Sequence, residues 1–314
     1  MGTHEGPGGH RVKLTHLHGE RVDVAHGGVR LLSYVYAPEA AFEAPKPYLH
    51  PLATLSGGVV TDYRPNDHRW HKGIQLTASH LSGQNLWGGN SYVHGEGYLE
   101  LPERVGSMTH EGFDEVRAQD GLAVLAERLT WRAHDGSAWA DERRRVETAV
   151  PRRDPGAWHL TLSTSVTNLR EEPLRFGSPT TEGRELAGYT GLFWRGPRAF
   201  RGGRILTADA EGPEVMGTQS QWLALSGEFD GVDGHATVVF AHAPENDHTG
   251  ERGTHPAHWF VRNEPFAAVA PSWAFYDELV LAPGDTLIRR YRVVVADGRW
   301  ERGDIATYLA EQPW

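Results

Sequence analysis

Residues 158–168 read WHLTLSTSVTN, and this short stretch decides the fold class. Two sets of residues alternate along it: His159, Thr161, Ser163 and Ser165 in one set, and Trp158, Leu160, Leu162, Thr164 and Val166 in the other. An alternation with a period of two places successive side chains on opposite faces of a strand. The stretch therefore predicts a β-strand that buries one face and exposes the other to water.

Similar strand-like runs recur along the chain. They cover Val29–Tyr36, Gly121–His134, Ala138–Val150, Thr237–His242 and Thr286–Ala296. Turn dipeptides separate several of these runs, and Asp135-Gly136 between two long runs predicts a β-hairpin. Many strands without interleaved helices indicate an all-β fold, and we expect a large antiparallel β-sandwich.

One helix is expected, at residues 302–312 (RGDIATYLAEQ), with Asp304 as its cap and Ile305 as its first helical residue. No linker rich in Pro, Gly or Ser and no internal repeat divides the chain, so we expect residues 11–314 to form a single β-sandwich domain. Residues 1–10 (MGTHEGPGGH) are typical of a disordered or tag-like end.

Composition excludes several function classes. The formal net charge of −10 over 314 residues disfavours nucleic acid and anionic membranes as partners. There is no Cys, which excludes disulfides, thiolate metal sites and Cys nucleophiles. No apolar run approaches the roughly 18 residues of a membrane span, so we expect a soluble, cytoplasmic protein. The 11 Trp and 18 His stand out, and Trp is a residue that stacks on sugar rings.

The segment Arg64–Gly73, RPNDHRWHKG, is the strongest candidate for a site. His68 and His71 are three residues apart, a spacing that would place them on opposite faces of a strand and brings them together only if the loop curls. Asp67 is well placed to orient one of the two imidazoles and to fix its tautomer. A solvated loop with unremarkable histidines is the alternative.

A second candidate segment is Ser178–Gly196, SPTTEGRELAGYTGLFWRG. Glu182 is a candidate general base, and Arg184 nearby would hold a carboxylate ionised. The segment adds four candidate substrate-binding residues, Tyr189 and Trp194 through their flat rings and Arg184 and Arg195 through their guanidinium groups. A structural loop pinned by a Glu182–Arg184 pair is the alternative.

Two further segments supply candidates for binding. In residues 81–97, LSGQNLWGGNSYVHGEG, Asn85 suits sugar hydroxyls and Trp87 suits a sugar face, although a plain long loop would have the same composition. His242 opens a stretch of carboxylates and imidazoles at residues 242–259 for which a polar surface loop is the simpler interpretation. His50 completes the set of candidate substrate-binding residues, to which Asp67 also belongs.

Four stretches resemble the bacterial PmoA family proteins: residues 50–61 (HPLATLSGGVVT), 65–73 (PNDHRWHKG), 181–184 (TEGR) and 191–196 (GLFWRG). The resemblance covers roughly residues 30 to 297. The family name is borrowed from a membrane-bound methane monooxygenase subunit, whose spanning helices this chain lacks. Typical members have a further His where this chain has Trp70, and that departure weakens a three-His metal site.

The layout also resembles the galactose mutarotase-like supersandwich, a single all-β domain that binds sugars on a concave face. Aldose epimerases of that class use a His acid and a Glu or Asp base. By analogy, the resemblance assigns the acid to His71 or His68 and the base to Glu182.

Three functions remain open at this point. The first is an enzyme doing His/Glu acid–base chemistry, such as epimerisation or mutarotation, on a small-molecule carbohydrate, without a cofactor. The second is a non-catalytic sugar-binding module. The third is a metal-dependent enzyme that uses His50, His68, His71 or His242 together with Glu182. We expect no tightly held structural metal, and homo-oligomer formation is compatible with the sequence.

Overall fold

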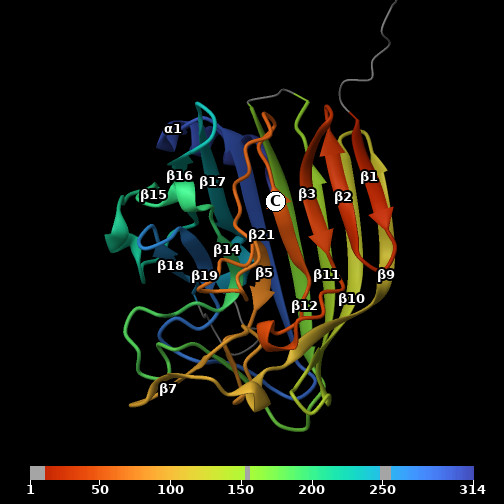
Figure 1. The fold of residues 1–314 in the computed structure, drawn as a ribbon, viewed down its shortest axis with the longest axis vertical. Helices are drawn as coiled ribbons and strands as arrows, with labels where there is room; N and C mark the ends of the chain where they lie inside the picture. The colour runs from red at the N-terminus through yellow and green to blue at the C-terminus, as the bar shows by residue number, and fades with distance from the viewer. Residues whose placement is uncertain (1–10, 153–155, 248–255) are drawn as a thin grey trace, which may run out of the picture.

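The computed structural model describes residues 11–152, 156–247 and 256–314 (Figure 1). The expected disordered or tag-like segment at residues 1–10 lies outside the described residues. Two large antiparallel sheets dominate the fold, as the strand pattern predicts. None of the helices in the described ranges is long and apolar enough to cross a membrane.

The first sheet has eight strands, in the spatial order β1 (Val12–Leu17), β2 (Arg21–His26), β3 (Val29–Val35), β4 (Tyr48–Leu52), β5 (Ile74–Thr77), β14 (Gly191–Arg195), β19 (Ala268–Ser272) and β18 (His258–Arg262). The second sheet also has eight, in the order β15 (Arg204–Thr207), β16 (Trp222–Glu228), β17 (His235–His242), β21 (Thr286–Asp297), β12 (Ala157–Asn168), β11 (Ala138–Ala149), β10 (Leu122–Arg132) and β9 (Ser107–Gln119). The neighbouring strands of both sheets pair antiparallel.

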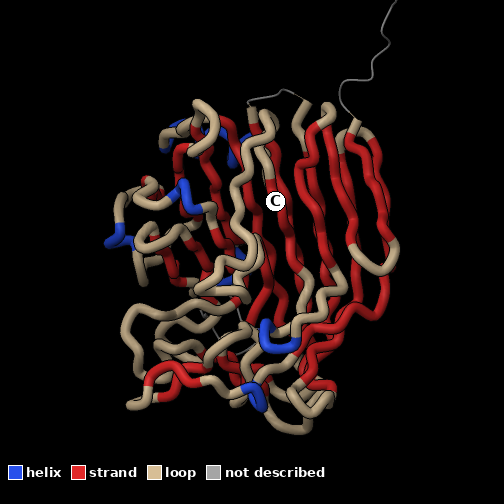
Figure 2. Tube along the Cα trace, viewed as in Figure 1, coloured by secondary structure: helices blue, strands red, loops and turns tan. Residues whose placement is uncertain are grey.

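Smaller elements complete the fold. A three-stranded sheet has the order β20 (Leu279–Leu281), β13 (Leu174–Gly177) and β6 (His80–Leu81), and a two-stranded hairpin joins β7 (Ser91–Val93) to β8 (Gly97–Leu99). Short 3₁₀ turns lie at Ala41–Glu43, Pro102–Arg104, Arg198–Phe200, Pro213–Val215 and Pro244–Asp247. Figure 2 shows the long loops gathered at the lower end of the two large sheets.

The predicted hairpin is confirmed. Strands β10 and β11 pair antiparallel along their length, and Asp135-Gly136 lies in the turn between them. Gly136 has a φ of 85°, a left-handed conformation that glycine adopts without steric cost.

The main hydrophobic core lies between the two large sheets, because both contribute apolar side chains to one cluster. A buried polar network interrupts it. Glu142 on β11 accepts hydrogen bonds from Arg144 Nε at 2.7 Å, from Trp131 Nε1 at 2.7 Å and from Thr164 Oγ1 at 2.8 Å. The Glu142 and Arg144 side chains are 0% and 2% exposed, so this ion pair is removed from water and fully partnered.

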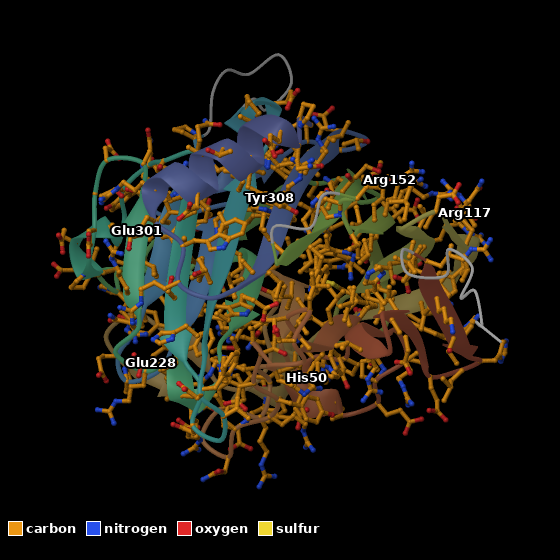
Figure 3. The ribbon with its side chains drawn as sticks, turned by 90° about the horizontal axis from the view of Figure 1, so that it is seen from above. His50, Arg117, Arg152, Glu228, Glu301 and Tyr308 are labelled. Atoms are coloured by element: carbon orange, nitrogen blue, oxygen red, sulfur yellow. The ribbon has the colours of Figure 1, made fainter. Side chains whose placement is uncertain are left out.

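The helix α1 (Arg302–Glu311) packs on the outer face of the second sheet, where Ile305 and Tyr308 join a separate apolar cluster. Figure 3 views the molecule from above and shows this helix on one side, with His50 of the first sheet toward the opposite side. The helix begins three residues before Ile305. Its N-cap is Glu301, whose backbone N–H donates to Asp304 at 2.9 Å, so Asp304 is the third helical residue and not the cap.

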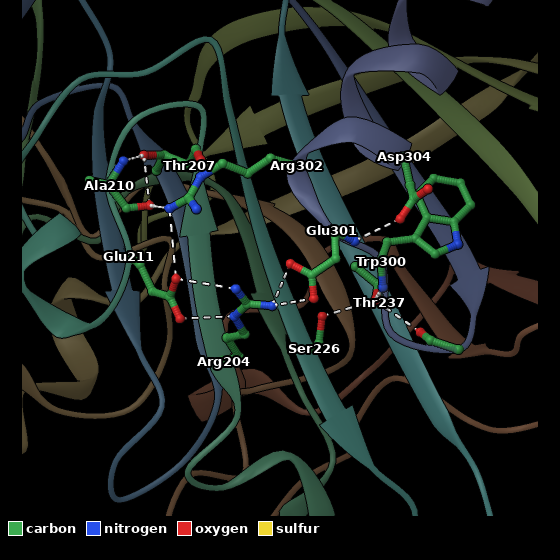
Figure 4. Close-up of polar contacts among 11 residues, drawn as sticks. Arg204, Thr207, Ala210, Glu211, Ser226, Thr237, Trp300, Glu301, Arg302 and Asp304 are labelled. Atoms are coloured by element: carbon green, nitrogen blue, oxygen red, sulfur yellow. Dashed lines mark hydrogen bonds and ion pairs between the residues drawn. The ribbon is translucent and has the colours of Figure 1, made fainter.

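A surface cluster joins α1 to the second sheet (Figure 4). The Arg204 guanidinium binds both Glu211 and Glu301, while Arg302 donates to the backbone carbonyl of Thr207. The helix also changes one expectation about residues 158–168. His159 on the expected wet face is buried, and its Nδ1 lies 2.8 Å from the Tyr308 hydroxyl, because α1 covers this end of β12.

Candidate functional site: a cavity on the outer face of the first sheet

Strands β14 and β18 of the first sheet carry apolar side chains on both faces. On β14, Leu192 and Trp194 point into the core between the sheets, whereas Phe193 joins a different apolar cluster on the outer face. On β18, Phe260 belongs to the same outer cluster. No described helix covers this face; loops cover it instead, and they leave a cavity of about 360 Å³. This volume lies within the usual range for small-molecule sites.

Aromatic and basic side chains line the cavity. The lining residues are His68, Trp70, His71, Trp87, Asn90, Tyr98, Arg184, Tyr189, Phe193, Phe260, Arg262, Pro265 and Phe266. They include no carboxylate. Flat aromatic surfaces with a few polar groups are suited to a ligand that has both apolar faces and hydroxyl groups.

The segment Arg64–Gly73 forms one wall of the cavity because its loop does curl. The His68 N–H donates to the Pro65 carbonyl at 2.9 Å and the His71 N–H to the His68 carbonyl at 3.0 Å, which makes two consecutive tight turns. The two imidazole rings therefore stack, with centroids 4.7 Å apart and planes 28° apart. Gly73 closes the loop at a φ of 57°, and a Cβ there would lie 2.1 Å from the Leu49 carbonyl oxygen.

His71 is held neutral and in one tautomer. Burial, with additional effects of His68, Arg195 and Lys46, holds the pKa of His71 well below its usual range. Arg195 donates an N–H to its Nδ1 at 3.1 Å, and an arginine cannot accept, so the ring proton must lie on Nε2. Nε2 has no hydrogen-bond partner in the described parts of the chain. His71 therefore offers the cavity an N–H donor.

His68 has the opposite arrangement. Its Nδ1 lies 3.0 Å from a carboxylate oxygen of Asp67, which favours a proton on Nδ1 and leaves Nε2 as an acceptor. Burial lowers the pKa of His68, although Asp67 opposes that shift. The expectation that Asp67 orients one imidazole thus concerns His68, whereas Arg195 orients His71.

Two arginines and two tyrosines from other segments also line the cavity. The Tyr98 and Tyr189 hydroxyl groups are 2.6 Å apart, and Arg184 donates to the Tyr98 hydroxyl and lies over its ring. The Arg262 guanidinium lies 5.4 Å from the Phe260 ring centroid and has no hydrogen bond or ion pair in the described ranges. Burial first, and then the charge of Arg184, lower the pKa of Arg262.

Glu182 does not lie in this cavity. It lines a separate one together with His80 and Glu278, and the imidazole on which its charge acts is that of His80. The reason is local: Gly183 has a φ of 96°, and the chain turns there, so that Glu182 and Arg184 line different cavities. The predicted pairing of Glu182 with His71 is therefore wrong. The alternative, a loop held by an ion pair between Glu182 and Arg184, is wrong as well.

His50 and His242 also lie elsewhere. The Nδ1 of His50 lies 2.9 Å from the Thr61 hydroxyl oxygen, and burial lowers the pKa of His50 to about 4. His242, on β17 of the second sheet, is buried with Nε2 3.1 Å from the Ser220 carbonyl oxygen. Of the five residues of the metal hypothesis, His68 and His71 lie together, whereas His50, His242 and Glu182 lie elsewhere. In the described ranges no group of three or more His, Asp or Glu side chains is arranged to hold a metal ion.

Two residues expected to bind substrate have structural contacts instead. Trp194 is 1% exposed in the core between the sheets, and its Nε1 donates to the Val60 carbonyl at 3.0 Å. Asn85 uses its whole amide inside its own loop: its oxygen accepts from the Trp87 and Gly88 N–H groups, and its nitrogen donates to Gly89 and Ser91. It thereby holds Trp87 at the cavity.

Sequence reasoning missed eight lining residues: Trp70, Asn90, Tyr98, Phe193, Phe260, Arg262, Pro265 and Phe266. Trp70 could have been predicted, because it lies inside the histidine segment. In the structure it packs on Gly88 and Gly89, where a Cβ atom would come within 2.8 Å of the Trp70 atoms. Phe193 could also have been predicted: it directly precedes Trp194 on a strand, so its side chain points to the opposite face of the sheet. Nothing in the sequence indicated Arg262, because it lies 78 residues beyond Arg184, the other charged residue of the described lining.

A family model for a family of unknown function, DUF6807, matches residues 21–310. The chain belongs to this family. The matching model carries that description and not the PmoA name that the motifs suggested. A search of curated protein sequences found no match to this member of DUF6807.

Solved structures of low sequence identity resemble this DUF6807 chain. The α-galactosidase from Lactobacillus brevis has a TM-score of 0.43 and 12% identity, with 91% of this chain and 39% of that chain covered. The galactose 1-epimerase from Lactobacillus acidophilus NCFM has a TM-score of 0.40 and 8% identity, with 89% and 95% covered. A galactose mutarotase related enzyme from Lactobacillus acidophilus has a TM-score of 0.34 and 10% identity, with 92% and 97% covered. This chain thus spans about two fifths of the α-galactosidase, and the comparisons concern the fold alone.

Proposed function

We propose that the cavity binds a carbohydrate and that His68 and His71 perform acid–base chemistry on it. The observation that carries the proposal is the stacked imidazole pair, in which an arginine faces Nδ1 of His71 and a carboxylate faces Nδ1 of His68, in a cavity lined by aromatic rings. Acid–base chemistry at a carbonyl or anomeric carbon needs one group that accepts a proton and one that stabilises the oxygen. The pair supplies both without a carboxylate.

In this proposal His68 is the base. Asp67 favours a proton on its Nδ1, so the Nε2 lone pair is free to accept a proton from a hydroxyl or C–H group of the substrate. A lowered pKa keeps this lone pair available near neutral pH, because the ring stays unprotonated.

His71 is the electrophilic partner and not a proton-donating imidazolium. Because burial and nearby cations keep the ring neutral, it acts through its Nε2–H, which polarises the substrate oxygen. A neutral imidazole is a known solution where an imidazolium would be too costly to bury. Arg195 is then a positioning residue, since it fixes the tautomer of His71 without lining the cavity.

Aromatic rings would hold the sugar. Trp87 and Tyr189 pack against each other at 4.5 Å between centroids, and Trp87 meets Phe193 at 4.6 Å, so the rings form one continuous wall. The compared epimerase and α-galactosidase are sugar enzymes by their descriptions, and the proposal assigns this chain to that broad class on the strength of its own cavity.

The test is turnover. Wild-type protein is mixed with a panel of aldoses, and anomer or epimer interconversion is followed by proton nuclear magnetic resonance. We expect His68→Gln and His71→Gln to lower the rate about 10²- to 10⁴-fold. His235→Gln is the matched control, because His235 is a half-exposed surface residue paired with Glu228.

Three outcomes are informative. Full activity in both cavity variants would refute the acid–base pair. Binding of sugars without turnover by the wild type would favour the non-catalytic sugar-binding module. Failure of both variants to unfold cooperatively on heating would indicate that the imidazole stack is needed for the fold.

A further inference from the structure

The charge of the cavity differs from that of the whole chain. The protein has a formal net charge of −10, yet the described residues that line the cavity include Arg184 and Arg262 and no carboxylate. Arginines elsewhere in the described ranges are mostly neutralised: Arg144 binds Glu142, Arg64 binds Glu43 and Arg204 binds two glutamates. The cavity arginines form no ion pair at all in those ranges.

Two like charges that share a partly buried wall repel each other. Keeping each guanidinium charged there costs more free energy than it would beside a carboxylate. The lowered pKa of Arg262, caused by burial and by Arg184, reflects that cost. Among the described residues, the Phe260 ring near the Arg262 guanidinium and the two tyrosines offset part of this cost, but no carboxylate does. A bound anion would, and a guanidinium group is suited to bind carboxylate or phosphate oxygens through two parallel hydrogen bonds.

We infer that the ligand of this cavity is an acidic carbohydrate, a sugar that carries a carboxylate or a phosphate group, and that Arg262 and Arg184 bind its anionic group. The inference rests on the proposed function, because it specifies the ligand class of the same cavity. The imidazole pair and the arginines belong to different segments of the lining, so the anionic group would lie at Arg262 and Arg184 while the reacting carbon faces His68 and His71.

The tyrosine pair supports this division of roles. Tyr98 and Tyr189 are hydrogen-bonded to each other, and Arg184 donates to Tyr98, so both hydroxyl groups are already engaged by the protein. This arrangement positions Arg184 while leaving its remaining N–H groups available. Arg262 forms no hydrogen bond to any residue that the structure describes, so its N–H groups can bind an incoming anion.

The experiment is isothermal titration calorimetry on the full chain. The ligands are galacturonate, glucuronate, galactose 6-phosphate and glucose 6-phosphate, each compared with its neutral hexose. We expect an acidic form to bind about 10- to 100-fold more tightly than the neutral one, the range that corresponds to hydrogen bonds with charged groups. Whether the uronate or the phosphate is preferred identifies the anionic group.

Variants locate the effect. Arg262→Met should remove most of the preference for the acidic sugar, and Arg262→Lys should keep part of it because the charge remains. Arg117→Met is the control, since Arg117 lies on the edge strand β9 and is exposed (Figure 3). If Arg262→Met does not fold, the wild-type preference and its decrease with added salt still test the inference.

The possible failures are distinguishable. If neutral hexoses bind as tightly as their acidic forms, the inference is overturned and the proposed function stands. If Arg262→Met retains the full preference, the arginine assignment is overturned. If no sugar of either kind binds the folded wild type, both the inference and the proposed function are overturned.

Discussion

Glu142 between the sheets and Arg262 in the cavity are both charged groups that folding has removed from much of the solvent, but their surroundings differ. Glu142 is fully buried and accepts hydrogen bonds from three side chains. Arg262 is partly buried, with no hydrogen bond or ion pair in the described ranges. Burying a charge costs free energy unless partners replace water. The Glu142 network is therefore fully partnered within the protein, whereas Arg262 lacks a charged partner in the described ranges, and a ligand can supply one.

The largest expected effect is a loss of stability on breaking the Glu142 network. Glu142→Gln should lower the free energy of unfolding by about 3–5 kcal/mol, because it leaves Arg144 charged and buried without its partner. Urea unfolding measures this loss. Glu115→Gln on β9 is the control, and its exposed pairs with Arg117 and Arg145 should contribute far less. Equal losses in the two variants would mean that burial does not distinguish these pairs.

The second prediction separates the two faces of β14. Trp194→Phe should lower the free energy of unfolding by about 2–3 kcal/mol, because it removes core volume and the hydrogen bond to Val60. The affinity for sugar should not change, since Trp194 faces the other sheet. Calorimetry on the folded variant checks this. A large loss of affinity would return Trp194 to the site.

A third prediction concerns pH. Burial lowers the pKa of His159 to about 4, below its ordinary value of about 6.5. Between these values the unfolded chain binds a proton that the folded chain does not, so stability falls as the pH drops below about 6.5. From pH 6.5 to 5 the contribution is about 2 kcal/mol. His159→Gln should lose correspondingly less stability over that interval in urea unfolding, and an unchanged pH dependence would contradict the assignment.

The smallest expected effect concerns ligand binding in the cavity. Trp87→Ala should weaken sugar binding by about 1–2 kcal/mol, because it removes one ring of the aromatic wall. Titration calorimetry against the best ligand of the panel measures it. Trp139, which lies on β11 and stacks on Arg170, is the matched Trp→Ala control and should leave binding unchanged. Comparable losses from both variants would argue against a specific wall.

The part of the candidate site that depends on contacts between neighbouring residues in the sequence was predictable. The segment Arg64–Gly73 reaches the cavity because its turns depend on neighbouring residues and on Gly73, all of which are contiguous in the sequence. The partner of His71 was not predictable in this way. Glu182 and Arg195 were both plausible from composition, and only the pairing of β14 with β5 brings Arg195 and not Glu182 to the imidazole.

By itself, the sequence determined β3 and the long strands of the second sheet, because alternation and turn dipeptides act over a few residues, and it determined the hairpin at Asp135-Gly136 and a helix near residue 302. Most of the shorter strands of the first sheet left no such pattern. The tertiary structure decided which face of each strand became a site. Both faces of β14 are apolar, so its pattern does not show that Phe193 meets loops while Trp194 meets the second sheet. Likewise, whether an arginine has a carboxylate partner depends on residues far along the chain, and only folding shows that Arg144 has one and Arg262 does not.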